Sequence, residues 1–188
     1  LAEDKIGGGG LLVHYDNLNE KTIDVSVSIN IKNEEKKKSA LVELRLLDNK
    51  GLDVFTNKKN IVLESNKSTN YISKFKIFNP KLWTPDNPQL HDLHVTIKST
   101  NGELLDNFKK RIGLRTIEMR GDDGFYLNGK SYPELLIGGN RHQDFAHIGH
   151  ALPNNLHYRD ALKLRQSGMR VIRSAHYVQD PAFMDACD

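Results

Sequence analysis

The sequence predicts a mainly β protein: an antiparallel β-sandwich of about 100 residues, then the opening strands and helices of a parallel α/β domain. Three observations support this division. Residues 22–32 alternate strictly between apolar and polar side chains, and weaker copies of that pattern recur up to residue 112. Beyond residue 118, short apolar runs alternate with helix-like stretches. The chain of 188 residues is therefore expected to hold two different kinds of domain.

The most regular strand of the predicted sandwich covers residues 22–32. Isoleucine and valine occupy one face, and Asp24, Ser26 and Ser28 lie on the other, which is the period of a half-buried strand. Turn-forming Asn, Asp, Ser and Gly residues separate it from five weaker strands. These are expected at residues 42–46, 61–63, 71–77, 93–97 and 105–112. The sandwich is predicted to span residues 21–118.

Residues 1–20 precede this pattern and are expected to be a lead-in from a preceding domain. Residues 7–10 are all glycine, which predicts a flexible stretch. No Gly-Lys-Ser or Gly-Lys-Thr follows them, so a phosphate-binding loop is rejected.

Composition excludes several functional classes. The net charge of +3 arises in residues 1–118, where the densest charged run, residues 34–38, has mixed sign and reads as a solvated loop. No nucleic-acid partner is therefore expected. No apolar run has the length of a membrane span and no targeting segment is present, so no membrane partner is expected and the compartment stays open between cytoplasm and periplasm.

The second region reads as strand, helix, strand, helix. Residues 135–139 form a short apolar run typical of a strand buried on both faces. A helix is expected from about residue 158 to 166, with Gly168 as its C-terminal cap, and a second buried strand at residues 169–173. Asp180 and Pro181 suit the start of the next helix. Residues 119–188 thus predict the beginning of a parallel α/β domain whose other strands lie outside this chain.

Polar and basic side chains that could form a site occur at the ends of these two strands. Asn140, Arg141 and His142 follow the first strand, and Arg173 and His176 lie at and just after the end of the second. Carboxyl ends of adjacent parallel strands share one face, so both histidines and both arginines are expected to converge on one pocket. Imidazole and guanidinium groups suit sugar hydroxyls or a carboxylate.

Other histidines and the lone tryptophan are weaker candidates. His147 and His150 have the spacing of a metal-ligand pair, but no third ligand stands at a typical zinc spacing, so no metal site is predicted. Trp83 is expected in the core rather than stacked on a sugar. The remaining histidines are expected to be surface or structural residues: His14, His91, His94 and His157.

Five segments carry a family resemblance. They read NPKLWTPDNP at residues 79–88, GLR at 113–115, FYLNGK at 125–130, GNRHQD at 139–144 and RSAHY at 173–177. In this order they resemble the β-galactosidases of glycoside hydrolase family 2. The resemblance implies an immunoglobulin-like sandwich at residues 21–118, followed at 119–188 by the first two strand-helix units of a truncated (β/α)8 barrel.

The resemblance also implies residue roles. His142 and His176 resemble histidines that bind galactose hydroxyls, and Arg173 resembles the arginine that positions the nucleophilic carboxylate. Asn140 and Arg141 match positions with a structural or supporting role. Retaining hydrolysis needs two glutamates, which are expected after Asp188. The piece itself is therefore expected to be inactive, with no catalytic residue within it.

The whole enzyme is expected to hydrolyse terminal β-D-galactosides. The resemblance implies that it can use magnesium through ligands outside this chain and that it forms a homo-oligomer, while the piece itself has no cofactor and no metal site. A β-glucuronidase is the nearer alternative. The Asn140-Arg141-His142 motif favours a galactosidase, because lysine is common at the arginine position in glucuronidases. The alternative from another class is a non-catalytic β-module that binds carbohydrate or braces neighbouring domains.

Overall fold

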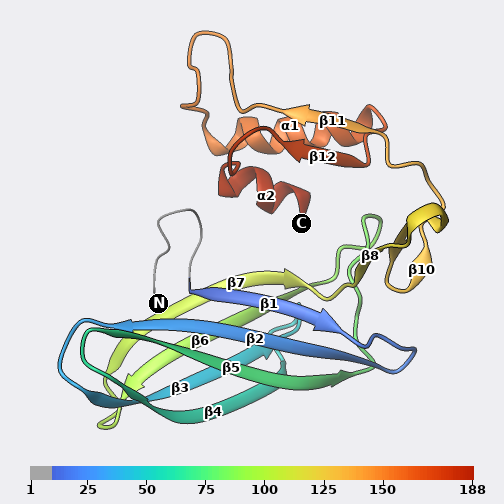
Figure 1. Ribbon diagram of the computed structural model, residues 1–188. Helices are drawn as coiled ribbons and strands as arrows, with labels where there is room; N and C mark the ends of the chain where they lie inside the picture. The colour runs from blue at the N-terminus through green and yellow to red at the C-terminus, as the bar shows by residue number, and fades with distance from the viewer. Residues whose placement is uncertain (1–9) are drawn as a thin grey trace. The chain divides into compact units, whose positions relative to one another are not determined.

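The computed structural model describes residues 10–188, which form two compact units (Figure 1). The first ends at Ser131 and the second spans Tyr132–Asp188. Antiparallel sheets of order β1-β2-β5 and β4-β3-β6-β7 dominate the first unit and confirm the predicted sandwich. Their strands are β1 (Leu11–Asp16), β2 (Thr22–Asn33), β3 (Lys38–Leu47), β4 (Asp53–Leu63), β5 (Lys67–Phe78), β6 (Leu90–Ser99) and β7 (Leu104–Gly113).

The core of the sandwich lies between its two sheets. The alternation of β2 turns its apolar residues inward, and Ile23, Val27 and Ile29 have no exposed surface. Each such side chain contributes about 1.5–3 kcal/mol through burial. Strands β3 and β6 supply the opposite face with Ala40, Val42, Leu44, Leu46, Leu93, Val95 and Ile97.

Strand β1 corrects the predicted lead-in of residues 1–20. Leu11–Asp16 pairs antiparallel with β2, with Val13 opposite Val27. Leu11, Val13 and Tyr15 alternate inward and pack against the core. The sandwich therefore begins at Leu11, and the prediction is wrong over this strand. The first part of the predicted lead-in, residues 1–9, lies outside the described residues.

A small antiparallel sheet completes the first unit. It contains β8 (Ile117–Met119), β9 (Phe125–Leu127) and β10 (Lys130–Ser131), with a 3-10 turn η1 (Gly121–Asp123) between the first two. The connection from β9 to β10 is an Asn-Gly hairpin turn, with positive φ values of 54° at Asn128 and 73° at Gly129.

Asn128 ties this small sheet to the sandwich. Its Nδ2 donates to the Trp83 carbonyl at 3.0 Å, and its Oδ1 accepts from the Thr116 amide at 3.1 Å. The first compact unit consequently continues past the boundary predicted at residue 118.

Trp83 is enclosed by its neighbours in the first unit. A Cβ built on Gly113 would lie 2.7 Å from the Trp83 Cβ, so only glycine allows this approach. The Arg115 guanidinium carbon lies 4.6 Å from the centroid of the indole ring. The indole is half-buried and is not among the residues of the apolar core, so the predicted core position is not confirmed, although the ring packs against its neighbours.

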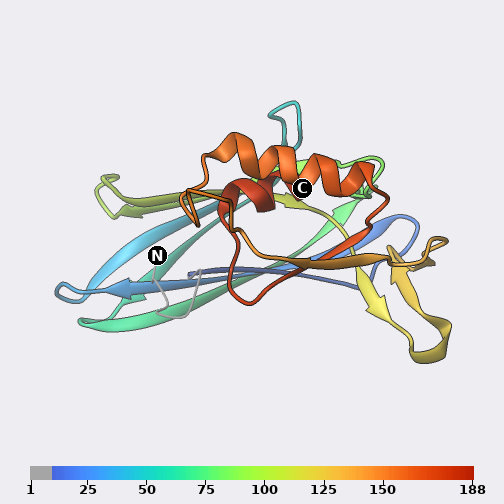
Figure 2. The ribbon, with the colours of Figure 1, turned by 90° about the horizontal axis from the view of Figure 1, so that it is seen from above.

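The second unit contains the predicted order of strand, helix, strand and helix: β11 (Gly138–Arg141), α1 (Asn154–Gln166), β12 (Val171–Ser174) and α2 (Pro181–Cys187). β11 and β12 are parallel, and Figure 2 shows α1 and α2 side by side. Gly168, with φ of 91°, follows α1 as predicted. The Asp180 side chain accepts from the Ala182 amide at 2.8 Å and caps α2. No helix among residues 10–188 is long and apolar enough to cross a membrane.

The first strand of this unit differs from its prediction. β11 begins at Gly138, after most of the apolar run at residues 135–139. Leu135 is 80% exposed and Ile137 is 62% exposed, so the run is not buried on both faces. The reason is that β11 pairs with β12 alone within the described residues, and a two-stranded sheet covers little apolar surface.

Candidate functional site

The carboxyl ends of β11 and β12 lie side by side because these strands are parallel. Asn140 is opposite Arg173 in the register, and Arg173 Nη1 donates a hydrogen bond to Asn140 Oδ1 at 3.3 Å. Both side chains are exposed. Asn140, predicted to follow the first strand, belongs to it. The contact holds the Arg173 guanidinium at the open side of the sheet.

His142 and His176 follow the ends of the same strands and meet there. Their ring centroids are 5.4 Å apart, and the ring planes are inclined at 75° in an edge-to-face arrangement. Both residues are exposed. Each imidazole has nitrogens that donate or accept hydrogen bonds, so the pair is able to hold a ligand with several hydroxyl groups.

Arg141 points away from this pair and corrects the expectation that both arginines enter the same pocket. Consecutive residues of a strand face opposite sides, so Arg141 is directed toward the helices and is only 5% exposed. Its Nη2 donates to Asp160 Oδ2 at 2.9 Å, and its Nη1 donates to Gln179 Oε1. The guanidinium carbon lies 3.9 Å from the ring centroid of Phe183.

His157 completes this buried polar cluster. A guanidinium group has only donors, so His157 Nδ1, 3.2 Å from Arg141 Nη2, is an acceptor and the ring proton is on Nε2. That nitrogen lies 4.0 Å from Asp180 Oδ2. His157 is fully buried, which fits its predicted structural role. Sequence reasoning missed Asp160 as a partner, although its spacing of three from His157 places both on one helix face.

Side chains also connect the segments that leave the two strands. The Tyr177 hydroxyl accepts a hydrogen bond from the Gln143 amide at 3.0 Å. The Asp180 amide in turn donates to Gln143 Oε1 at 2.8 Å. The His150 ring contacts the Asp144 carboxylate through Nε2. None of these connections was predicted from the sequence. The two hydrogen bonds of Gln143 join residues 34 and 37 apart along the chain, and no local pattern signals such contacts.

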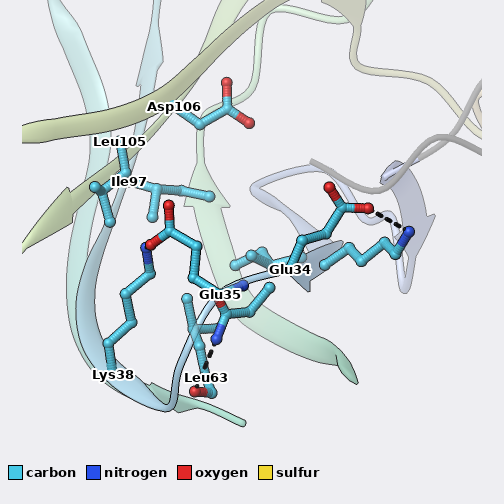
Figure 3. A pocket seen from close by; sticks show the side chains of 10 residues that line it. Glu34, Glu35, Lys38, Leu63, Ile97, Leu105 and Asp106 are labelled. Atoms are coloured by element: carbon cyan, nitrogen blue, oxygen red, sulfur yellow. Dashed lines mark hydrogen bonds and ion pairs between the residues drawn. The ribbon is translucent and has the colours of Figure 1, made fainter. Parts of the chain in front are cut away.

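A cavity of about 570 Å³ lies elsewhere, at one end of the sandwich (Figure 3). Core side chains form its apolar floor, and charged side chains form its rim. Glu34 pairs with Lys32 at 2.5 Å, and Glu35 pairs with Lys38 at 2.8 Å. Hydrogen bonds from these lysines, reinforced by their charge, lower the pKa of both carboxyl groups. Each carboxylate is thus paired with a lysine, as expected of a solvated loop. The residues that line this cavity include no histidine or arginine like those at the ends of β11 and β12.

Metal ligands and catalytic carboxylates are the other groups that bear on the chemistry of this site. Within residues 10–188, no three His, Cys, Asp or Glu side chains are placed to hold a metal ion, so this part of the chain does not fit the magnesium that the resemblance implies. Residues 119–188 contain one glutamate, Glu134. It precedes β11 and forms an ion pair with Arg170, away from the carboxyl ends of the strands.

Proteins similar to this chain include β-galactosidases and β-glucuronidases. The chain is 32% identical over 180 residues to a β-galactosidase of Thermoanaerobacter pseudethanolicus, covering 92% of this chain and 22% of that protein. It is 27% identical to a β-glucuronidase of Formosa agariphila, covering 98% of this chain and 19% of the relative. The crystal structure of a Bacteroides uniformis β-glucuronidase superposes with a TM-score of 0.84 at 32% identity, covering 95% of this chain and 21% of that one.

The chain thus spans about a fifth of the length of these relatives. Two sequence profiles match it and between them cover both compact units. The profile described as glycosyl hydrolases family 2 matches residues 11–115. The one described as glycosyl hydrolases family 2, TIM barrel domain, matches residues 117–188. These matches agree with the sandwich and with the parallel strands that carry the histidine pair, and the chain belongs to glycosyl hydrolase family 2.

Proposed function

We propose that this chain is part of a retaining β-galactosidase that hydrolyses terminal β-D-galactosides. The observation that supports it best is the meeting of His142 and His176 at the ends of two parallel strands, with ring centroids 5.4 Å apart. Both imidazoles are exposed and are proposed to hold sugar hydroxyls through contacts that strengthen in the transition state.

Arg173 is proposed to orient the nucleophile. Retaining hydrolysis uses two carboxyl groups about 5–5.5 Å apart, one as the nucleophile and one as the acid and base. Neither has a counterpart at the carboxyl ends of β11 and β12. Both are proposed to come from later strands of the barrel, with the nucleophilic carboxylate lying against the Arg173 guanidinium that Asn140 holds. On this proposal the 188-residue chain alone is inactive.

A galactoside is favoured by the Asn140-Arg141-His142 motif, because glucuronidases commonly have lysine at the position of Arg141. The Arg141 guanidinium is buried and bonded to Asp160 and Gln179, so it is proposed to support the fold of the site rather than to contact the sugar. β-Glucuronidase remains the second candidate, because proteins of that name are among the relatives.

The test compares two substrates. Both are assayed with the protein that carries this chain in its native flanking sequence. We expect kcat/KM to be higher for an aryl β-galactoside than for the matching β-glucuronide. Alanine at His142 or His176 should lower kcat by about a hundredfold, which corresponds to about 2.7 kcal/mol of transition-state stabilisation. His14→Ala, at an exposed histidine of β1, is the control. Unchanged turnover in both active-site variants would reject the assignment.

The alternative of a non-catalytic carbohydrate-binding module is tested on the chain itself. Galactose titrated into the 188-residue chain should release no measurable heat, because the proposed site lacks its carboxylates. Saturable heat that disappears in His142→Ala would favour a binding module.

A further inference from the structure

The two histidines lie just past the backbone hydrogen bonds that join their segments. The register of β11 and β12 ends with Arg141 opposite Ser174, and one more backbone hydrogen bond runs from the Ala175 amide to the Arg141 carbonyl at 3.1 Å. From His142 and His176 onward, side-chain contacts join the two segments. A site that holds one sugar ring needs such groups within a fraction of an ångström.

Among the side-chain hydrogen bonds that join the two segments, the one made by Tyr177 lies nearest to both histidines. It directly follows His176, and its hydroxyl accepts a hydrogen bond at 3.0 Å from the amide of Gln143, which directly follows His142. One side chain thus joins the backbone next to one histidine to the backbone next to the other. The ring centroid of Tyr177 lies 6.3 Å from that of His142, with the ring planes at 69°, so the ring also supports the imidazole edge.

A loop histidine also lies against the Tyr177 ring. The His150 ring centroid is 5.2 Å from that of Tyr177, and His150 Nε2 lies 3.5 Å from the hydroxyl. The same nitrogen also contacts the Asp144 carboxylate. The half-buried Tyr177 ring therefore contacts two imidazoles, which restricts its freedom to turn.

The remaining cross-links act further from the rings. Gln179 Nε2 donates to the Arg141 carbonyl at 3.3 Å, and the Asp180 amide donates to Gln143 Oε1 at 2.8 Å. These contacts tie the outer parts of the two segments together. The amide of the peptide between His142 and Gln143 is instead bound by the Tyr177 hydroxyl.

We propose that Tyr177 is a positioning residue that sets the distance and orientation of His142 relative to His176, so that both imidazoles address one sugar ring. The geometric part of this inference concerns the chain alone. Its functional part rests on the proposed glycosidase activity. The two parts are tested separately, so that failure of one is distinguishable from failure of the other.

The geometric test uses NMR on the 188-residue chain with Tyr177→Phe, which removes the acceptor and keeps the ring. We expect the Gln143 amide to exchange about tenfold faster and the cross-relaxation between the His142 and His176 rings to weaken. Tyr158→Phe is the control, because Tyr158 is an exposed tyrosine of α1.

Two outcomes would overturn the proposal. Wild-type exchange at Gln143 together with unchanged cross-relaxation would show that the hydroxyl does not fix the pair. Faster exchange throughout α1 would show that the hydroxyl supports the whole second unit rather than the histidines.

The functional test uses the protein that carries this chain in its native flanking sequence. Tyr177→Phe should lower kcat for an aryl β-galactoside about tenfold, with a smaller effect on KM and no effect in Tyr158→Phe. Galactosidase activity that is insensitive to Tyr177→Phe would reject the positioning role and leave the proposed function intact. No galactosidase activity in the wild type, combined with the NMR changes, would reject the proposed function and leave the geometric inference intact.

Discussion

The two compact units bury different kinds of side chain. The sandwich encloses an apolar core whose central side chains, such as Ile29 and Leu44, are at most 1% exposed. In the second unit the residues buried between strands and helices include Arg141, His157 and Gln179, while apolar residues such as Ile137 lie exposed. The sandwich is thus stabilised chiefly by the hydrophobic effect, whereas the strand-helix unit combines buried apolar side chains such as Phe183 with a hydrogen-bonded polar cluster.

The largest effect is expected in the sandwich core. Leu44→Ala should lower the free energy of unfolding of the first unit by about 3 kcal/mol, because it removes buried surface and leaves a cavity. Urea denaturation followed by the fluorescence of Trp83, the single tryptophan, measures it. Ile72→Ala, at a side chain that is 51% exposed, should cost much less. Similar losses in both variants would contradict the view of a closed core.

A smaller effect should come from the polar cluster. Arg141→Met keeps the length of the side chain but leaves His157 and Asp160 without their donor. It should destabilise the second unit by about 2–3 kcal/mol, because unpaired buried groups are costly.

Hydrogen exchange of α1 measures this loss, with Lys163→Met, at an exposed position, as the control. The urea midpoint reported by Trp83 should not move, since Trp83 belongs to the first unit. A parallel shift of that midpoint would show that the two units unfold together.

The smallest effect concerns pH and the sandwich. His91 on β6 is 4% exposed, and burial lowers its pKa below the usual 6.5, with Asp48 acting in the opposite direction. The unfolded chain therefore takes up the proton first as pH falls. The stability that the neutral ring provides is complete above pH 6.5 and is lost as pH drops through the lower pKa of the folded state.

Urea midpoints measured by Trp83 fluorescence between about pH 7 and 5 test this expectation, since unperturbed histidine titrates in that range. His91→Gln should flatten the profile, and His14→Gln, at an exposed residue, should not. Identical slopes in wild type and His91→Gln would contradict it.

Sequence reasoning was accurate where a segment has its own periodic pattern. β2 is long and lies between β1 and β5, so its alternation is strong enough to identify by itself. β1 has only three inward apolar residues and directly follows a glycine run, and its strand character depends on pairing with β2. The same limit explains β11, where an exposed apolar run concealed the start of the strand.

The candidate site was predictable in its location but not in its orientation. Topology alone indicates that the carboxyl ends of two parallel strands meet, which brought His142 and His176 together. Whether Arg141 faces the site or the helices depends on the strand register, because a shift of one residue reverses every side chain. Contacts such as Arg141 with Gln179 join residues 38 apart, and no local pattern signals them.

The close approach of Trp83 to Gly113 couples the substitutions that these two positions can accept. A methyl group on Gly113 would overlap the Trp83 side chain at 2.7 Å, so neither residue is free to change alone. Among related sequences, a larger residue at position 113 should occur together with a smaller residue at position 83. The two sites are thus expected to evolve as one unit, although thirty positions separate them in the sequence.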